Sequence, residues 1–285
     1  MHIVTTGIDG VSLSFSILES IEKIIPILFP EITFDMFSKG KSKLKAYRNC
    51  YSLKTTSNNT LVQVHTGAYS HFGHRNLLQI KGLTFSDSAL NALRPFDLNR
   101  LLYVAKRFQA NITKIDPYID VVGGNIPIDQ INEMTLPHNF DQFIQSPFLK
   151  VQKGILPEPR RVNGTVYIGQ SGGNVCEIVS YSKGLSPRQR VHTRENPLKY
   201  TWHRFELRFA NSTSKRIGQL LFDELRDGSN LNTCIAALFR RYLRFVEPSE
   251  TNKRKSSWPL QKWYADLLNQ AAQLESVTFT GEVPL

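Results

Sequence analysis

The alternation of apolar and polar residues predicts strands along most of the chain. Residues Gly10–Ile17 alternate as a half-buried strand does, and similar patterns recur throughout the sequence. The further segments are Ala46–Thr55, Leu61–Thr66, Asn76–Leu83, Asn111–Val122, Thr165–Gly169, Val175–Ser182 and Thr201–Ala210.

Apolar residues at three- and four-residue spacing predict helices between and after these strands. The helical segments are Glu19–Phe29, Ser86–Phe108, Thr213–Asp227, Leu231–Val246 and Trp258–Leu274. We expect Pro26 to disturb the first helix and Pro95 the second. Together the elements predict an α+β fold, in which helices pack on one face of a large, mainly antiparallel sheet.

The sequence also suggests two halves. Four prolines and little periodicity in Pro137–Arg161 indicate a linker. We therefore expect an N-terminal half at residues 1–136, a linker at 137–163 and a C-terminal half at 164–285. Both halves have strands, then a helix, then strands, which hints at a duplication.

Composition limits the class of protein. Hydrophobic residues make up 41% of the 285 residues, which is enough for a sizeable core and excludes wholesale disorder. The three cysteines have no short spacing, which argues against a disulfide scaffold and a cysteine-based zinc site. We find no signal peptide pattern and no long apolar run, and therefore expect a cytoplasmic protein without a membrane partner.

Positive charge is concentrated in two stretches. The chain carries 35 Lys and Arg against 24 Asp and Glu, a net charge of +11, which points to a polyanionic partner. Met36–Ser86 contains no acid and has a net charge of +8, and Lys183–Lys255 has +9. The first stretch holds four alternating lysines: Lys39, Lys41, Lys43 and Lys45. In an extended segment they share a face that could follow a phosphate backbone or guard an edge strand, and the lack of acids favours the first.

Three predicted strands have a face that combines acids, bases and phenols. These faces hold Lys114, Asp116, Tyr118 and Asp120; Glu177, Val179, Tyr181 and Lys183; and Arg204, Glu206 and Arg208. Carboxylates on neighbouring strands could hold a divalent cation, and a phenol beside it could attack phosphorus. Lys183 and Arg204 could neutralise the charge that develops. Cross-strand ion pairs on a solvated face are the alternative.

Four sequence motifs resemble a known family. They are GIDGVSLSF near the start, NITKIDPYIDV, TVYIGQSGGN from Thr165 with EIVSYSKG from Glu177, and WHRFELRF from Trp202. In this order they resemble the Rep_trans family, the rolling-circle replication initiators of Gram-positive plasmids and some filamentous phages. The resemblance covers about Gly7 to Phe245.

The resemblance implies an origin-specific enzyme that nicks and closes a single DNA strand. Tyr181 would be the nucleophile that keeps the 5′-phosphate, with Tyr167 as the alternative, and Lys183 and Arg204 would act on the scissile phosphate. The implied ligands of Mg²⁺ or Mn²⁺ are Asp116, Glu206 and Asp120. We expect the Tyr181 oxygen to lie within about 8–10 Å of the carboxylates of Asp116 and Glu206, which leaves room for a phosphate.

Further residues are expected to bind DNA. They are Lys39, Lys41, Lys43, Lys45, Lys114, Arg208, Arg240, Arg241 and Arg244. The last three lie at the end of a predicted helix, which could read a major groove, contact phosphate alone, or pack on the sheet with a solvated basic face. The implied partners are double-stranded origin DNA, single-stranded DNA, a second copy of the chain and a helicase.

The chain departs from the family pattern at Val179, Ser182 and Lys114, where the family commonly has a basic residue, an acid or Asn, and Arg. It also has no His-x-His pair, and we interpret His71 and His74 as surface residues. A non-catalytic, sequence-specific DNA-binding protein, such as a repressor, a partition factor or an inactive relative of the family, is the rival hypothesis. It needs only the basic surface.

Overall fold

The structure, a computed structural model, divides into two compact units that are each assembled from distant stretches of sequence. It describes residues 3–16, 21–30, 32–54, 60–69, 75–81, 98–122, 126, 128–136, 139, 142–145, 160–162, 165–169, 176–182, 202–226 and 230–274. Unit 1 comprises Met1–Gly7, Asp116–Thr213 and Asp223–Ser276, and unit 2 comprises Ile8–Ile115, Ser214–Phe222 and Val277–Leu285. These units are not the consecutive halves 1–136 and 164–285, and most of the expected linker at 137–163 lies outside the described residues.

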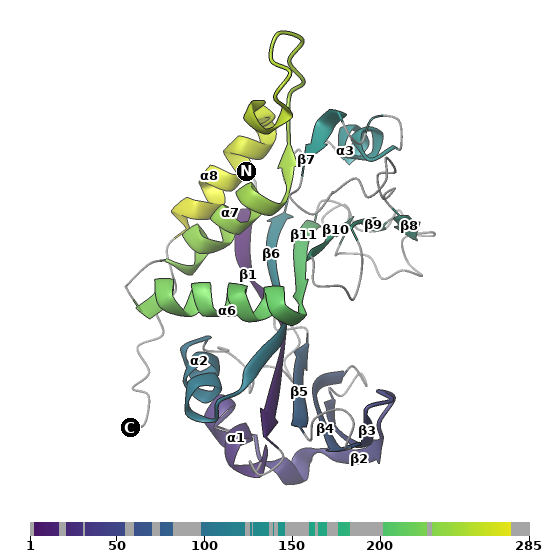
Figure 1. The fold of residues 1–285 in the computed structure, drawn as a ribbon, viewed down its shortest axis with the longest axis vertical. Coiled ribbons are helices and arrows are strands. Elements are labelled where there is room, and N and C mark those ends of the chain that lie inside the picture. The colour runs from purple at the N-terminus through teal and green to yellow at the C-terminus, as the bar shows by residue number, and fades with distance from the viewer. Residues whose placement is uncertain are drawn as a thin grey trace. The chain divides into compact units, whose positions relative to one another are not determined.

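The predicted strands and helices that the structure describes appear in the predicted order, together with short elements that the sequence does not predict (Figure 1). The strands are β1 Ile3–Ser16, β2 Ser38–Lys41, β3 Tyr47–Lys54, β4 Thr60–Ala68, β5 Arg75–Lys81, β6 Asn111–Val122, β7 Ile144–Gln145, β8 Arg160–Val162, β9 Thr165–Ile168, β10 Cys176–Ser182, β11 Trp202–Ala210 and β12 Arg244–Phe245. The helices are α1 Ile21–Leu28, α2 Leu98–Arg107, α3 Ile128–Met134, α6 Asn211–Arg226, α7 Leu231–Tyr242 and α8 Lys262–Gln273, with short 3₁₀ turns at Phe34–Met36 and Lys255–Ser257. None of these helices combines the length and the apolar character that crossing a bilayer requires.

Most of the described strands belong to one large sheet. They are hydrogen-bonded in the order β2-β3-β4-β5-β1-β6-β11-β10-β9-β8, and β12 pairs separately with β7. The ladders from β2 to β1 and from β11 to β8 are antiparallel. Strands β1 and β6 each contribute residues to both units. The sheet confirms the α+β class expected from the sequence.

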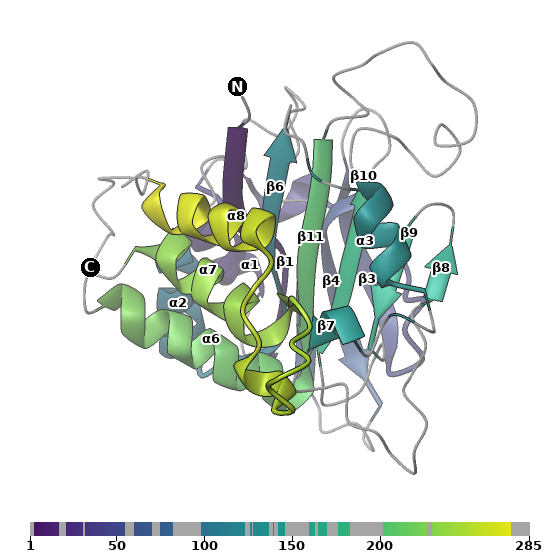
Figure 2. The same ribbon diagram turned by 90° about the horizontal axis from the view of Figure 1, so that it is seen from above.

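The core of unit 1 forms where two helices cover the apolar face of β11 (Figure 2). Phe205, Leu207 and Phe209 alternate along this strand and are fully buried. The ring of Phe205 lies 6.4 Å from that of Trp263 on α8, and the ring of Phe209 lies 4.9 Å from that of Tyr242 on α7. Because α7 and α8 occupy this face, the polar residues that alternate with these apolar ones must face the other side of the sheet.

Unit 2 buries its own apolar residues. Helix α1 buries Ile21, Ile24, Ile25 and Leu28, the spacing of one helical face. The sequence predicts that Pro26 disturbs this helix, but the helix continues past it to Leu28. Helix α6 comes so close to β6 that a β-carbon on Gly218 would lie 2.3 Å from Ile112 Cδ1. Its Ser214 hydroxyl donates to the Ile112 carbonyl at 3.1 Å, so a small face on α6 allows it to dock on the strand.

The four lysines share an extended segment only in part. Lys39 and Lys41 lie on β2, which ends at Lys41, and a turn follows, closed by Tyr47 N–H donating to the Leu44 carbonyl at 3.1 Å. The helix predicted over Leu231–Val246 ends at Tyr242, where the chain becomes extended and β12 pairs with β7. That prediction is wrong at its C-terminal end because nonlocal strand pairing overrides a locally plausible period.

We predict that Gly7→Ala destabilises unit 1. A β-carbon on Gly7 would lie 2.7 Å from Tyr118 Oη, and the Arg204 guanidinium stacks on that ring, 3.8 Å from its centroid. The ring therefore has little room to move, and we expect a loss of about 1–3 kcal/mol in the free energy of unfolding. Urea titration followed by circular dichroism measures it. Gly40→Ala is the matched control, because its β-carbon would meet only the Cys50 carbonyl at 3.9 Å.

Candidate functional site

Three neighbouring strands of unit 1 create a polar face. Strands β6, β11 and β10 are adjacent, and β10 pairs antiparallel with β11. This register sets Tyr181 opposite Arg204, and Glu177 opposite Arg208. Val179 lies opposite Glu206 and contributes no charge of its own. Strand alternation thereby gathers a phenol, two arginines and two acids on one surface.

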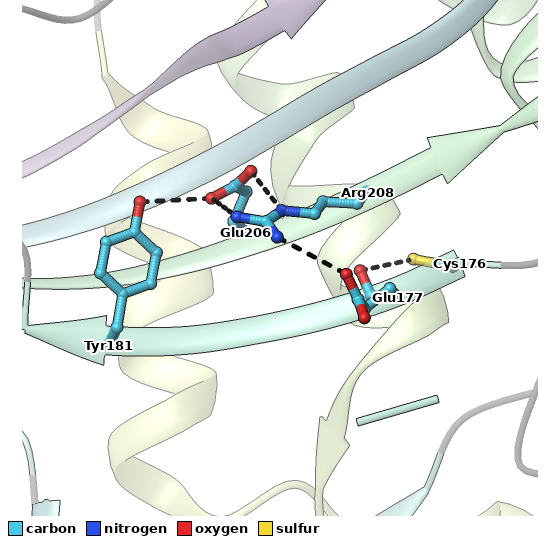
Figure 3. Close-up of polar contacts among 5 residues, drawn as sticks. All are labelled: Cys176, Glu177, Tyr181, Glu206 and Arg208. Carbon is cyan, nitrogen blue, oxygen red and sulfur yellow. Dashed lines mark hydrogen bonds and ion pairs between the residues drawn. The ribbon is translucent and has the colours of Figure 1, made fainter. Parts of the chain in front are cut away.

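Tyr181 and Glu206 point toward one another from β10 and β11 (Figure 3). The Tyr181 hydroxyl donates to Glu206 Oε2 at 3.3 Å, which is nearer than the expected span of about 8–10 Å and leaves no room for a phosphate between the two groups. The contact is longer than the roughly 2.7–2.8 Å typical of O–H···O hydrogen bonds. Because catalytic hydrogen bonds often tighten only when substrate is bound, the geometry suits transfer of the phenol proton to this carboxylate.

Arg208 links two buried carboxylates (Figure 3). Its Nε donates to Glu206 Oε1 at 2.8 Å, its Nη2 donates to Glu206 Oε2 at 3.3 Å, and its Nη1 lies 3.5 Å from Glu177 Oε2. Burial acts to lower the pKa of Arg208, but the hydrogen bond to Glu206 and the charges of Glu206, Asp116 and Glu177 raise that pKa above its ordinary value. The guanidinium therefore stays charged and balances the acids.

Arg204 forms a closed pair with Asp120. Its Nε and Nη2 donate to Asp120 Oδ1 and Oδ2, both at 2.5 Å, and the two side chains are 0% and 4% exposed. Tyr118 stacks on the guanidinium. Because Arg204 engages both Asp120 oxygens, this arrangement leaves Asp120 unavailable as a metal ligand and keeps Arg204 from a phosphate. Asp120 could bind a metal, and Arg204 a phosphate, only if this ion pair opened. We therefore assign the pair a structural role that supports the site.

The remaining acids have the right chemistry for a divalent cation but not a preformed arrangement. Asp116, Glu177 and Glu206 are buried, and carboxylate oxygens are the ligands that Mg²⁺ and Mn²⁺ prefer. In the part of the chain that the structure describes, no three His, Cys, Asp or Glu side chains are grouped closely enough to hold a metal ion. Glu177 and Glu206 hold the guanidinium of Arg208 instead.

The alternative nucleophile lies on the same face. Tyr167 on β9 pairs with Val179, which in turn lies opposite Glu206, and Tyr167 is half-buried. Cys176 is no competitor as a nucleophile, because burial raises the pKa of its thiol well above the ordinary value. Its Sγ is 3.7 Å from the Glu177 carbonyl (Figure 3). The hydrogen bond to Glu206 therefore favours Tyr181 as the nucleophile.

The basic residues expected to bind DNA are distributed over both units. In unit 2, Lys39, Lys41, Lys43 and Lys45 are exposed, and β2 is the last strand on its side of the sheet. Lys114 is half-buried on the unit 2 part of β6, two residues before Asp116. Lys183 lies outside the described residues. The edge position of β2 agrees with the interpretation that Lys39 and Lys41 protect an edge strand from pairing with other chains. Both lysines are exposed, so they are also available to DNA.

The three C-terminal arginines have different surroundings. Arg240 and Arg241 are exposed on the last turn of α7, and Arg240 donates to Asn269 Oδ1 at 3.0 Å. Arg244 lies on β12 and donates to the carbonyls of Ser256 and Trp258 at 2.8 and 2.7 Å. It therefore fastens the segment before α8. The prediction that Arg244 lies on the helix is wrong, because α7 ends at Tyr242, and its contact with DNA stays a prediction.

Glu177 belongs to the cluster although the sequence does not single it out. Alternation alone places it on the Tyr181 face, but only the register shows that it opposes Arg208. The histidine pair His71 and His74 lies outside the described residues. Buried His203 has a structural contact, because its Nε2 is 2.8 Å from Ser180 Oγ.

Comparisons with known proteins agree with this geometry. A family model described as replication initiation factor matches residues 110–283, a range that includes all of β6, β10 and β11. Among solved structures, a rolling circle replication initiator protein from Geobacillus stearothermophilus matches with a TM-score of 0.68 and 18% sequence identity. That match covers 95% of this chain and 98% of the other, and it shows a shared fold. No curated protein matches the chain.

Proposed function

Because the chain belongs to the replication initiation factor family, we propose that it starts rolling-circle replication by nicking one strand of origin DNA through Tyr181. The hydrogen bond from the Tyr181 hydroxyl to Glu206, 3.3 Å long, carries this proposal. It joins a candidate nucleophile and a candidate proton acceptor on adjacent strands of the matched segment. The fold shared with a rolling circle initiator supports the same reaction class.

The proposed step is a transesterification. The Tyr181 oxygen attacks the scissile phosphorus as its proton passes to the Glu206 carboxylate, and the P–O3′ bond breaks. The 3′ oxygen leaves and takes up a proton, while the 5′-phosphate stays on Tyr181 as a phosphodiester. Since one phosphodiester replaces another, the reverse attack by a 3′-hydroxyl closes the strand without an external energy source.

The protein would supply charge stabilisation along with the nucleophile. Mg²⁺ or Mn²⁺ held by Glu206 and Asp116 would polarise the scissile phosphate and stabilise the charge that develops there. Arg208 engages both oxygens of Glu206, so the ion would have to displace it. Because the Arg208 side chain is 31% exposed, the displaced guanidinium could then contact a phosphate. The partners that follow are double-stranded origin DNA, the displaced single strand, a second copy of the chain and a helicase.

A supercoiled plasmid that carries the gene for this chain with its flanking DNA tests the proposal. With Mg²⁺ or Mn²⁺, the protein should convert it to relaxed circles and form an adduct that survives denaturing gel electrophoresis. If the phosphate at the 5′ side of the nick carries a radioactive label, that label should remain attached to the protein. If the protein slows the migration of the DNA in a native gel but forms no adduct, the result would instead support the hypothesis of a non-catalytic DNA-binding protein.

The exposed lysines of β2 give a second prediction. Replacing Lys39 and Lys41 with Gln should weaken DNA binding and reduce the slope of log affinity against log salt by about 0.9 for each phosphate of duplex DNA that is no longer neutralised. Fluorescence anisotropy between about 50 and 200 mM salt measures it. Lys262→Gln is the control, since that lysine is 87% exposed and pairs with Asp266 on its own helix. If the Lys39 and Lys41 variant has the same slope as the unchanged protein, β2 does not belong to the DNA interface.

A further inference from the structure

Arg208 occupies the position where carboxylates of two strands converge. It is bound to Glu206 at 2.8 Å and lies 3.5 Å from Glu177, whose strand, β10, also carries Tyr181. The carboxylates are 2% and 7% exposed, so each needs a nearby cation to offset the loss of water. In the described cluster, the guanidinium meets that need.

We infer that Arg208 is a resident counter-ion, and that a divalent cation binds Glu206 and Glu177 only when the Arg208 guanidinium moves away. This inference rests on the proposed function, because that function is what calls for a cation at these acids. It adds Glu177 as a ligand and makes Arg208 a competitor of the ion.

The exposure of the three side chains fits such an exchange. Arg208 is 31% exposed, whereas the two carboxylates are almost entirely buried. The guanidinium can therefore rotate into solvent on its flexible stem while the carboxylates stay in place on their strands. A divalent ion restores the neutralisation that Arg208 gave and adds a second positive charge, so the acids remain balanced throughout.

Direct measurement of Mn²⁺ binding tests the exchange without DNA. Isothermal titration of the full chain should show that Arg208→Gln binds Mn²⁺ on the order of tenfold more tightly than the unchanged protein, because the ion no longer has to break charge-assisted hydrogen bonds. Mn²⁺ should also raise the Tm of Arg208→Gln by more than it raises the Tm of the unchanged protein. Arg216→Gln, which removes the same charge from an exposed position on α6, should bind Mn²⁺ as the unchanged protein does.

Two more variants keep the test decisive. Adding Glu177→Gln to Arg208→Gln should lower the Mn²⁺ affinity about tenfold by removing a ligand. If Arg208→Gln fails to fold without the ion, Arg208→Lys keeps the charge but loses the fork, and should show a smaller gain in the same direction. Equal or weaker Mn²⁺ binding by the Arg208 variants, no binding by any protein, or no effect of Glu177→Gln would overturn the inference. These Mn²⁺ measurements are independent of nicking. The protein could nick DNA even if the inference about Arg208 fails, and Mn²⁺ binding can be measured even if the protein does not nick.

Discussion

Replacing Tyr181 with Phe should abolish the covalent adduct with DNA and reduce nicking by at least about a thousandfold. The substitution removes only the hydroxyl that donates to Glu206 and leaves the ring on β10. Since the nucleophilic oxygen itself is lost, neither salt nor cation concentration should restore the reaction. Denaturing gel electrophoresis after incubation with supercoiled plasmid measures both products.

Tyr167→Phe is the matched control for this prediction. Tyr167 lies on the same face, but Tyr181 has the hydrogen bond to Glu206, so the control should form adduct at close to the unchanged rate. The reverse result, in which Tyr167→Phe loses the adduct and Tyr181→Phe keeps it, would assign the nucleophile to β9. DNA affinity should stay equal in both variants, which separates loss of chemistry from loss of binding.

Asp120→Ala should have the largest effect on stability. It would remove both carboxylate oxygens to which the Arg204 guanidinium donates, and that guanidinium is 0% exposed. Breaking one partner of such a pair costs about 3–5 kcal/mol, which corresponds to a fall in Tm of roughly 6–20 °C. Differential scanning calorimetry without DNA measures it.

A surface pair provides the comparison. Asp266→Ala breaks the pair between Lys262 and Asp266, whose side chains are 87% and 53% exposed, and should change the Tm little. The double variant Arg204→Met with Asp120→Leu should recover most of the lost stability, because apolar groups of similar size need no partner. If Asp120→Ala and Asp266→Ala unfold at the same temperature, the buried pair contributes no net stability.

The sequence predicts faces well because alternation is a local property. Tyr181 on β10 and Glu206 on β11 can each be assigned to a polar face from their own strands. Their meeting depends on the register between β10 and β11, which a single sequence does not specify. The same limit explains why the sequence suggests a phosphate role for Arg204, although the structure commits it to Asp120.

Local periodicity also fails where tertiary contacts set the end of an element. The helical spacing continues through Arg244, yet the chain leaves the helix after Tyr242. Arg244 then reaches two backbone carbonyls near α8, a gain that no helical pattern reveals.

The long sequence separations in the polar cluster have a consequence for synthesis of the chain. Asp120 precedes its partner Arg204 by 84 residues, and Tyr181 precedes Glu206 by 25. A ribosome therefore releases β6 and β10 well before β11, the strand that supplies both arginines and Glu206. Pairing of distant segments is slow compared with local folding. A chain that stops before β11 thus lacks Arg204, Glu206 and Arg208 and cannot form the cluster.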